Sequence, residues 1–203
     1  MSQSNVVLRR VPKQQRSKER YDKVLASART LIAERGNDGV SMREIAEDSA
    51  VPIGSVYQYF PDKNAILWTL MSDQFDRLET EWLAELEQVA SIPDLTELSV
   101  QLFDRFAELC HLDPCFSRLW RSVQANSVLA ELDRDLNKRI ADATRDKLVE
   151  LGVSNLDNRV WLNSFMVASL SSTALQLAFS EHDIRDDLLD EFRKLLRSQF
   201  LIK

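Results

Sequence analysis

The side chains between Ser41 and Lys63 carry the groups in this sequence that are best suited to recognition chemistry. Arg43 presents a planar set of donors that can pair with guanine, and Gln58 can both donate to and accept from adenine. Ile53 can pack on a thymine methyl group. Groups suited to binding phosphates lie close by, at Ser55, Tyr59 and Lys63. The combination predicts contact with a nucleic acid, and a solvated surface is the alternative interpretation.

Two short helices and a turn must position these groups. Ser41 is followed three residues later by Glu44, a capping-box spacing that predicts a helix from near Met42. Residues 49–51 form the expected turn, and Pro52 can open a second helix because the first helical residue needs no N–H. The expected inward side chains are Ile45, Ala46, Val51, Val56 and Phe60. The outward side then has the small Gly54 at its middle, which favours close approach to a partner.

This stretch resembles the DNA-binding signature of the TetR family of transcriptional repressors, at Ile45-Ala46, Val51, Gly54-Ser55-Val56-Tyr57, Tyr59-Phe60 and Lys63. The resemblance covers roughly the first quarter of the chain. Two positions depart from the family pattern: Ala50 stands where the turn usually has Gly, and Pro52 replaces the usual Ser or Thr cap. If the turn needs a positive φ, alanine there costs about 1 kcal/mol.

The resemblance implies a fold and a function. The expected fold is all-α, with an N-terminal three-helix helix-turn-helix DNA-binding domain followed by a larger helical ligand-binding and dimerisation domain. The expected function is that of a cytoplasmic, ligand-responsive regulator, a repressor that binds a palindromic DNA operator as a homodimer. The expected DNA-binding residues are Arg43, Ile53, Gly54, Ser55, Tyr57, Gln58, Tyr59 and Lys63. For Tyr57 the alternative is a structural ring packed between helices.

The composition independently favours an all-α fold. Only 4 Gly and 5 Pro occur among 203 residues, and apolar residues recur at helical spacing. We expect a basic arm over 1–14, the DNA-binding domain over 15–64 and the effector and dimerisation domain over 65–203. The expected helices outside the motif cover 17–35, 62–89, a stretch from 93, a stretch from 114, 127–151, 155–180 and 185–200.

Charge is distributed unevenly along the chain. Residues 1–70 hold 11 Lys and Arg against 8 Asp and Glu, whereas the remaining residues hold 15 against 24. Basic residues crowd the amino end, at Arg9, Arg10, Lys13, Arg16, Lys18, Arg20 and Lys23. A flexible arm or the first helix could therefore neutralise phosphates at the edge of a binding site. A solvated terminus without that role is the alternative.

The last two expected helices are the best candidates for a homodimer interface. The helix over 155–180 carries more apolar surface than one core-facing stripe can use. In proteins that resemble this one, the last two helices of two subunits form a four-helix interface. Burial inside a single chain is the alternative.

The resemblance also implies a pocket for a small effector in the larger domain, suited to an apolar or aromatic ligand. Aromatic and sulfur-containing side chains at helical spacing are candidates for its lining, although an ordinary core would look similar. The candidates are Trp68, Phe75, Phe103, Phe106, Phe116, Trp120, Phe165 and Met166. The helix over 62–89 would then transmit the effect of the ligand to the DNA-binding unit.

Other classes of function have little support in the sequence. Cys110, His111 and Cys115 could ligate zinc, but no fourth ligand is evident nearby, so we expect neither a metal nor a cofactor. The two cysteines fit a reducing cytoplasm. An all-α enzyme is one rival, although no phosphate loop or nucleophile motif occurs. An interaction protein that keeps the helix-turn-helix as a scaffold is another. No apolar run approaches the roughly 20 residues that cross a membrane.

Overall fold

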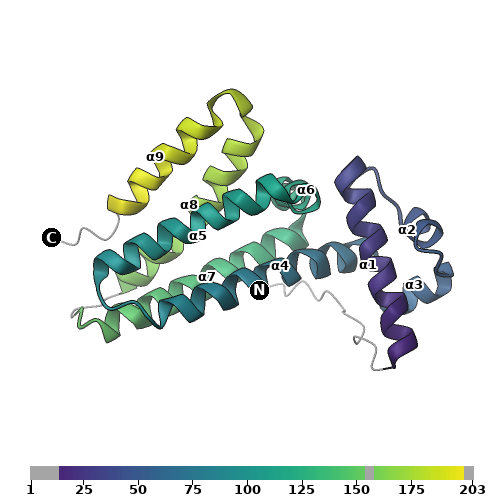
Figure 1. The fold of residues 1–203 in the computed structure, drawn as a ribbon, viewed down its shortest axis with the longest axis horizontal. Helices are drawn as coiled ribbons and strands as arrows, with labels where there is room; N and C mark the ends of the chain where they lie inside the picture. The colour runs from purple at the N-terminus through teal and green to yellow at the C-terminus, as the bar shows by residue number, and fades with distance from the viewer. Residues whose placement is uncertain (1–13, 154–157, 199–203) are drawn as a thin grey trace. The chain divides into compact units, whose positions relative to one another are not determined.

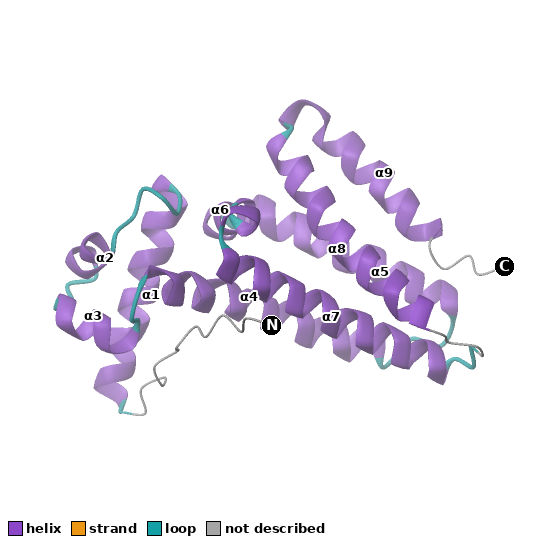
Figure 2. Cartoon of the chain, turned by 180° about the vertical axis from the view of Figure 1, so that it is seen from behind, coloured by secondary structure: helices purple, strands orange, loops and turns teal. Residues whose placement is uncertain are grey.

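The computed structural model describes residues 14–153 and 158–198, and these residues form helices without any strand (Figure 2). The all-α prediction is confirmed. The α-helices, labelled in Figure 1, are α1 Gln15–Arg35, α2 Met42–Asp48, α3 Ile53–Tyr59, α4 Lys63–Leu86, α5 Ile92–Leu112, α6 Pro114–Arg121, α7 Ser127–Glu150, α8 Asn158–Ser180 and α9 Arg185–Ser198. Two short 3-10 helices cover Val123–Ala125 and His182–Ile184.

Local capping explains where several helices begin. Asp62 accepts a hydrogen bond from the backbone N–H of Ala65 at 2.9 Å, so α4 starts one residue later than predicted. Ser91 likewise accepts from the N–H of Asp94 at 3.3 Å, which places the start of α5 one residue before Pro93. The predicted ends at 155–157 and at 199–200 lie outside the described residues.

The chain divides into two compact units. The first contains the described residues of Met1–Gln74 together with His111–Leu132, and the second contains Phe75–Cys110 together with those of Asp133–Lys203. Helices α4, α5 and α7 each contribute residues to both units. This grouping differs from the functional boundary predicted after residue 64, because α6 packs against α1. The functional boundary itself stays a prediction.

The first unit is built around α1, with α2 and α3 packed against it (Figure 1). Its core includes Val24, Ile45 and Val56, which have no exposed surface. Tyr21 stacks on Phe60 with ring centroids 4.8 Å apart. Since α1 ends at a glycine with φ of +78°, the chain can reverse sharply toward α2.

Two polar contacts attach α6 to α1 within this unit. Asp113 caps α6 by accepting from the N–H groups of Cys115 and Phe116, and the same carboxylate pairs with Arg29 of α1. Arg118 of α6 donates to the backbone carbonyl of Glu34 at 3.3 Å. These contacts place α6 with the N-terminal helices, although it lies in the part of the sequence expected to bind an effector.

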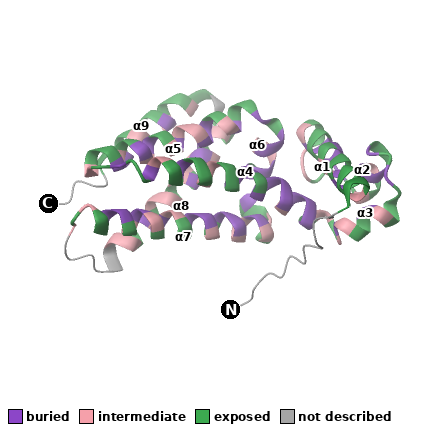
Figure 3. Cartoon of the chain, turned by 60° about the horizontal axis from the view of Figure 1, so that its bottom comes forward, coloured by how far each residue is buried: buried purple, intermediate pink, exposed green. Residues whose placement is uncertain are grey.

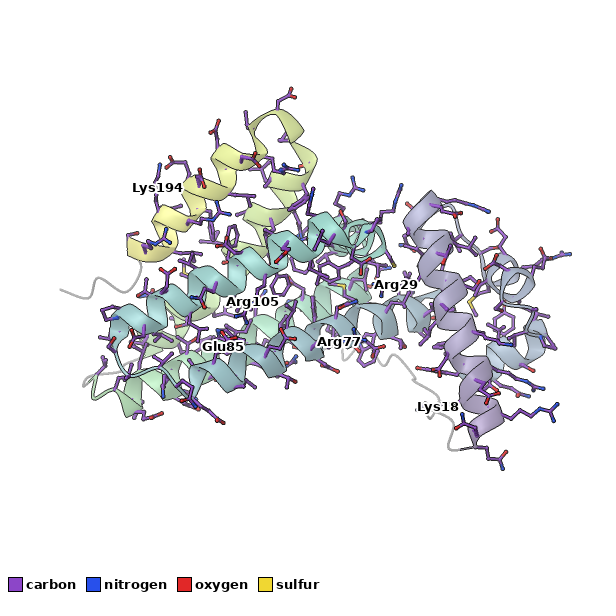
Figure 4. The ribbon with its side chains drawn as sticks, in the orientation of Figure 1. Lys18, Arg29, Arg77, Glu85, Arg105 and Lys194 are labelled. Carbon is purple, nitrogen blue, oxygen red and sulfur yellow. The ribbon has the colours of Figure 1, made fainter. Side chains whose placement is uncertain are left out.

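The second unit has an apolar core of its own. Trp82, Leu95 and Leu148 are at most 2% exposed and belong to one cluster. Arg105 of α5 bridges both carboxylate oxygens of Glu85 in α4 at 2.7 Å (Figure 4). Buried and exposed residues alternate along α7 (Figure 3), as expected for an amphipathic helix. Helices α8 and α9 pack against each other.

Candidate nucleic-acid interface

The start of α2 has the predicted capping box. The Ser41 hydroxyl accepts from the N–H of Glu44 at 3.3 Å, while the Glu44 carboxylate accepts from the N–H of Ser41 at 2.9 Å. These bonds hold the pKa of Glu44 below its usual value. The capping box therefore fixes the first turn of α2, on which Arg43 lies.

The turn after α2 has a positive φ at Ala50, which is the condition under which alanine is strained. Ala50 has φ of +52°, and it is the one non-glycine residue in this region among the described residues. Its N–H donates to the carbonyl of Glu47 at 3.2 Å, and the N–H of Val51 donates to the carbonyl of Ala46 at 3.1 Å. This is the pair of bonds that closes a helix with a left-handed residue. The turn therefore has the left-handed geometry that favours glycine, although alanine occupies position 50.

Replacing Ala50 with Gly should therefore stabilise the protein. We expect the free energy of unfolding to rise by about 0.5–1 kcal/mol, because glycine removes the left-handed penalty. Urea denaturation measures the change. Ala26→Gly is the matched control, since Ala26 is an exposed residue inside α1. There glycine should destabilise by about 1 kcal/mol. Destabilisation by both substitutions would contradict the strain at Ala50.

Pro52 caps α3 from outside the helix. It has φ of −52° and an extended ψ of 133°, so the predicted helical start at Pro52 is wrong by one residue and α3 starts at Ile53. Its carbonyl accepts from the N–H groups of Ser55 and Val56 at 2.7 and 3.1 Å. No side chain caps this end of α3. The second departure from the family pattern therefore removes a side-chain cap without preventing the helix.

The outer face of α3 presents most of the predicted contact residues. Val56 is fully buried, whereas Ile53 is 41% exposed and Tyr57 is 46% exposed. Gly54 and Gln58 are also exposed, and Ser55 and Tyr59 are half-buried. Tyr57 is therefore partly open to a partner, and its role stays a prediction. Tyr59 instead lies edge-on to Tyr21, with ring centroids 6.0 Å apart.

Packing within the described residues does not explain why position 54 is glycine. A Cβ atom added there would meet nothing within 4 Å. Glycine within a helix costs about 0.5–1 kcal/mol relative to alanine, and packing within the described residues does not require it. An external molecule that approaches the backbone closely would explain the choice.

Arg43 is available to such a molecule at little cost. Its side chain is 85% exposed and pairs with Glu47, four residues later on α2, at 2.9 Å. Exposed pairs of this spacing contribute only about 0.3–0.5 kcal/mol, so the guanidinium can leave Glu47 for a stronger partner.

Lys63 has a structural partner that the sequence did not indicate. Its ammonium donates to the backbone carbonyls of Asn37 at 2.8 Å and Val40 at 3.1 Å. Two of its three donors therefore hold the loop that precedes α2. The assignment of Lys63 to a phosphate stays a prediction, and any substitution there also affects this loop.

The basic amino end is only partly described. Arg9, Arg10 and Lys13 lie outside the described residues. Exposed basic side chains follow on the first turns of α1, at Arg16, Lys18, Arg20 and Lys23, and Figure 4 labels Lys18. They provide positive charge on the unit that contains α3.

The predicted effector-pocket residues are divided between the two units. Trp68, Phe116 and Trp120 belong to the first unit, where Phe116 stacks on Trp120 at 5.7 Å. The other five belong to the second unit, where Phe75 and Phe106 lie 6.0 Å apart; the five are Phe75, Phe103, Phe106, Phe165 and Met166. Met166 is 56% exposed. Their role as a pocket lining stays a prediction.

The cysteines are buried thiols. Neither Cys110 nor Cys115 forms a disulfide bond, and burial raises the pKa of Cys115 to about 12, so this thiol stays protonated at neutral pH. His111 is exposed. Within the described residues, no three His, Cys, Asp or Glu side chains gather closely enough to hold a metal ion.

Sequence and fold comparisons identify the family. The pattern of bacterial regulatory proteins of the tetR family matches residues 24–68. The pattern of the tetracyclin repressor-like C-terminal domain matches residues 93–202, more than half of the chain. The chain belongs to the TetR family of transcriptional regulators. Members of the TetR family are regulators and not enzymes, so the rival prediction of an all-α enzyme is wrong.

Individual TetR-family proteins agree with this assignment. The HTH-type transcriptional repressor KstR of Rhodococcus jostii is 24% identical over 154 residues, covering 73% of this chain and 72% of the relative. A TetR-family regulator of Syntrophomonas wolfei has the same fold, with a TM-score of 0.69 and 19% identity over 89% of this chain and 94% of its own. One from Streptomyces coelicolor has a TM-score of 0.65 and 23% identity, over 89% and 96%. In the described part of the chain, no helix has the length and apolarity needed to cross a membrane.

Proposed function

We propose that this TetR-family regulator is a repressor that binds a palindromic operator as a homodimer and leaves it when a small, apolar or aromatic effector binds. The observation that carries the proposal is the outer face of α3. That face combines an exposed apolar side chain at Ile53, an exposed amide at Gln58 and a glycine between them with open space above it. These groups match the base edges and close approach of a DNA major groove.

An apolar stripe on α8 supports the homodimer. Leu162, Met166, Leu170 and Leu177 are 42 to 56% exposed, and their spacing places them on one face of the helix. Leu195 of α9 is 61% exposed. A second copy of the chain would cover this stripe, and a two-fold axis would present two α3 helices to matched half-sites.

Selection of genomic fragments by the purified protein tests the proposal directly. We expect recovered fragments to share an inverted repeat, with binding that weakens steeply as salt rises. Fragments without a shared motif would contradict a sequence-specific repressor. The genes next to the repeat would then indicate candidate effectors. Release of the protein from the repeat by a candidate effector would test the proposed effector response.

Replacing Gly54 with Ala should separate folding from DNA binding. We expect the free energy of unfolding to rise by up to about 1 kcal/mol, because alanine is the better helix residue and its Cβ meets no atom. Affinity for the selected operator should fall about tenfold, since the methyl group enters the space needed by the DNA. Unchanged affinity in a fluorescence anisotropy titration would remove Gly54 from the interface.

Arg43→Ala should reduce discrimination at one base pair in each half-site. A bidentate contact to guanine is worth about 1–3 kcal/mol, so the loss should appear on the operator and not on random DNA. Lys63→Ala should weaken binding to both, with some loss of stability because Asn37 and Val40 lose their partner. Equal losses on operator and random DNA for Arg43→Ala would contradict base reading. Denaturation curves of both variants separate binding from folding.

A further inference from the structure

A buried polar cluster lies where α7 meets α8 in the second unit. The Ser172 hydroxyl of α8 donates to a carboxylate oxygen of Asp133 in α7 at 2.9 Å. The Asn137 amide, one turn further along α7, reaches the same hydroxyl at 3.5 Å. All three residues are at most 9% exposed. Such polar groups are unusual in an otherwise apolar core, and each normally has at least one hydrogen-bond partner.

Gln176 follows the cluster along α8 and has a side-chain nitrogen without a hydrogen-bond partner. It follows Ser172 by four residues, so both side chains lie on the same face of α8. Its side-chain nitrogen is buried, and no acceptor among the described residues is within hydrogen-bond distance. A buried donor without a partner costs free energy that a bound molecule with an acceptor would recover.

The carboxylate of Asp133 has lone pairs that can accept further hydrogen bonds. No lysine or arginine side chain in the described ranges forms an ion pair with it, and its closest recorded donor is a neutral hydroxyl. Burial raises its pKa to about 6, with hydrogen bonds from Ser172 and Asn137 opposing the rise. At neutral pH the carboxylate is therefore mostly ionised and gains from any further donor.

A hydroxyl group meets both needs, because it donates one hydrogen and accepts through its lone pairs. A hydroxyl in contact with both residues would donate to Asp133 and accept from Gln176. The match requires the Gln176 amide to present its nitrogen to the hydroxyl, because one hydroxyl has a single hydrogen to donate and Asp133 takes it. A cation would satisfy only Asp133, and an ether or ketone would satisfy only Gln176.

We infer that Asp133 and Gln176 form a polar anchor for the hydroxyl group of a small alcohol or phenol whose remaining surface is apolar. The inference rests on the proposed effector response and specifies the chemical class of the effector. It also separates this anchor from the aromatic residues predicted from the sequence, none of which belongs to the cluster.

Matched probe pairs test the anchor on the full-length protein. Phenol, 2-naphthol and cyclohexanol are titrated against their methyl ethers, which keep the shape and the acceptor but cannot donate. Binding is followed by thermal stabilisation and by isothermal titration at pH 8. We expect at least one alcohol to bind about tenfold or more tightly than its ether. A hydrogen bond to a charged group typically contributes a difference of this size.

Two variants and a control assign the preference to the cluster. Gln176→Leu should keep the fold, because the amide nitrogen has no partner to lose, and should reduce the preference for the alcohol severalfold or more. Asp133→Asn should reduce it similarly while keeping an acceptor for Ser172. Gln101→Leu, at an exposed position of α5, should leave the preference unchanged.

Several results would overturn the anchor. These are equal binding of alcohols and ethers, no stabilisation by any alcohol, or a preference that survives both Gln176→Leu and Asp133→Asn. The cluster would then be a structural element of the core only. Operator binding by the same preparations reports separately on the proposed function. If the protein binds its operator but does not distinguish an alcohol from its ether, the anchor is wrong and the proposed function still stands.

Discussion

Met166→Glu should convert the protein from a dimer into a monomer and reduce operator affinity by about 100-fold or more, since binding one half-site alone forfeits the gain from linking two. Met166 is 56% exposed and lies one turn from both Leu162 and Leu170 on the apolar stripe of α8. In a two-fold interface each substitution occurs twice, so two carboxylates would be buried without partners. Sedimentation velocity measures the oligomeric state, and anisotropy titrations measure the affinity.

A matched substitution shows whether the position matters. Val149 is 57% exposed on α7 and lies outside the α8 stripe. We expect Val149→Glu to remain dimeric with native operator affinity. If Met166→Glu stays dimeric and Val149→Glu does not, the interface lies away from the α8 stripe. If the wild-type protein and both variants are monomeric at micromolar concentration, the homodimer proposal fails.

Asp133→Asn should stabilise the protein at alkaline pH and much less in acid. Burial raises the pKa of this carboxyl from its usual 3.8 to about 6, so the folded protein holds the proton more tightly than the unfolded chain. The stabilisation by the protonated carboxyl is complete below the pKa that Asp133 has in the unfolded chain. It is lost as pH rises through the folded-state pKa of about 6. Above that range, folding must bury a charge, which costs on the order of 2–3 kcal/mol.

The asparagine variant removes that charge and keeps an oxygen to accept from Ser172. We expect the free energy of unfolding to increase by about 2 kcal/mol at pH 8, and the difference from wild type to shrink toward pH 4. Urea denaturation across this range provides the comparison. Asp135→Asn is the control: Asp135 is about half exposed and pairs with Lys138, so its loss should change stability by no more than about 0.5 kcal/mol. A destabilisation by Asp133→Asn that is the same at every pH would contradict a buried, ionised carboxylate.

Features set by neighbouring residues were predictable from the sequence. The capping box at Ser41 and Glu44, the start of α2 and the end of α1 before Gly36 all appear as expected. The exposed pattern of α3 followed from the spacing of Val56 and Phe60, which are buried. The turn at Ala50 is likewise local, and its φ of +52° meets the condition on which the predicted penalty depends.

The partners of polar side chains far apart in the sequence were not predictable. Nothing near Lys63 indicated that its ammonium would bond to carbonyls more than 20 residues earlier. The sequence likewise did not indicate that Asp113 would pair with Arg29 and so attach α6 to α1. Nothing in the sequence near Asp133 indicates that its carboxylate would accept a hydrogen bond from Ser172, 39 residues later on α8.

The sequence by itself determined the helices, the turn and the family signature, because caps, backbone hydrogen bonds and apolar periodicity act within about four residues. Only the tertiary structure decided which of the polar groups were free to meet a ligand and which were already engaged. That choice depends on how separate helices pack. Packing removes water from some polar groups, such as Asp133, and leaves others, such as Arg43, exposed.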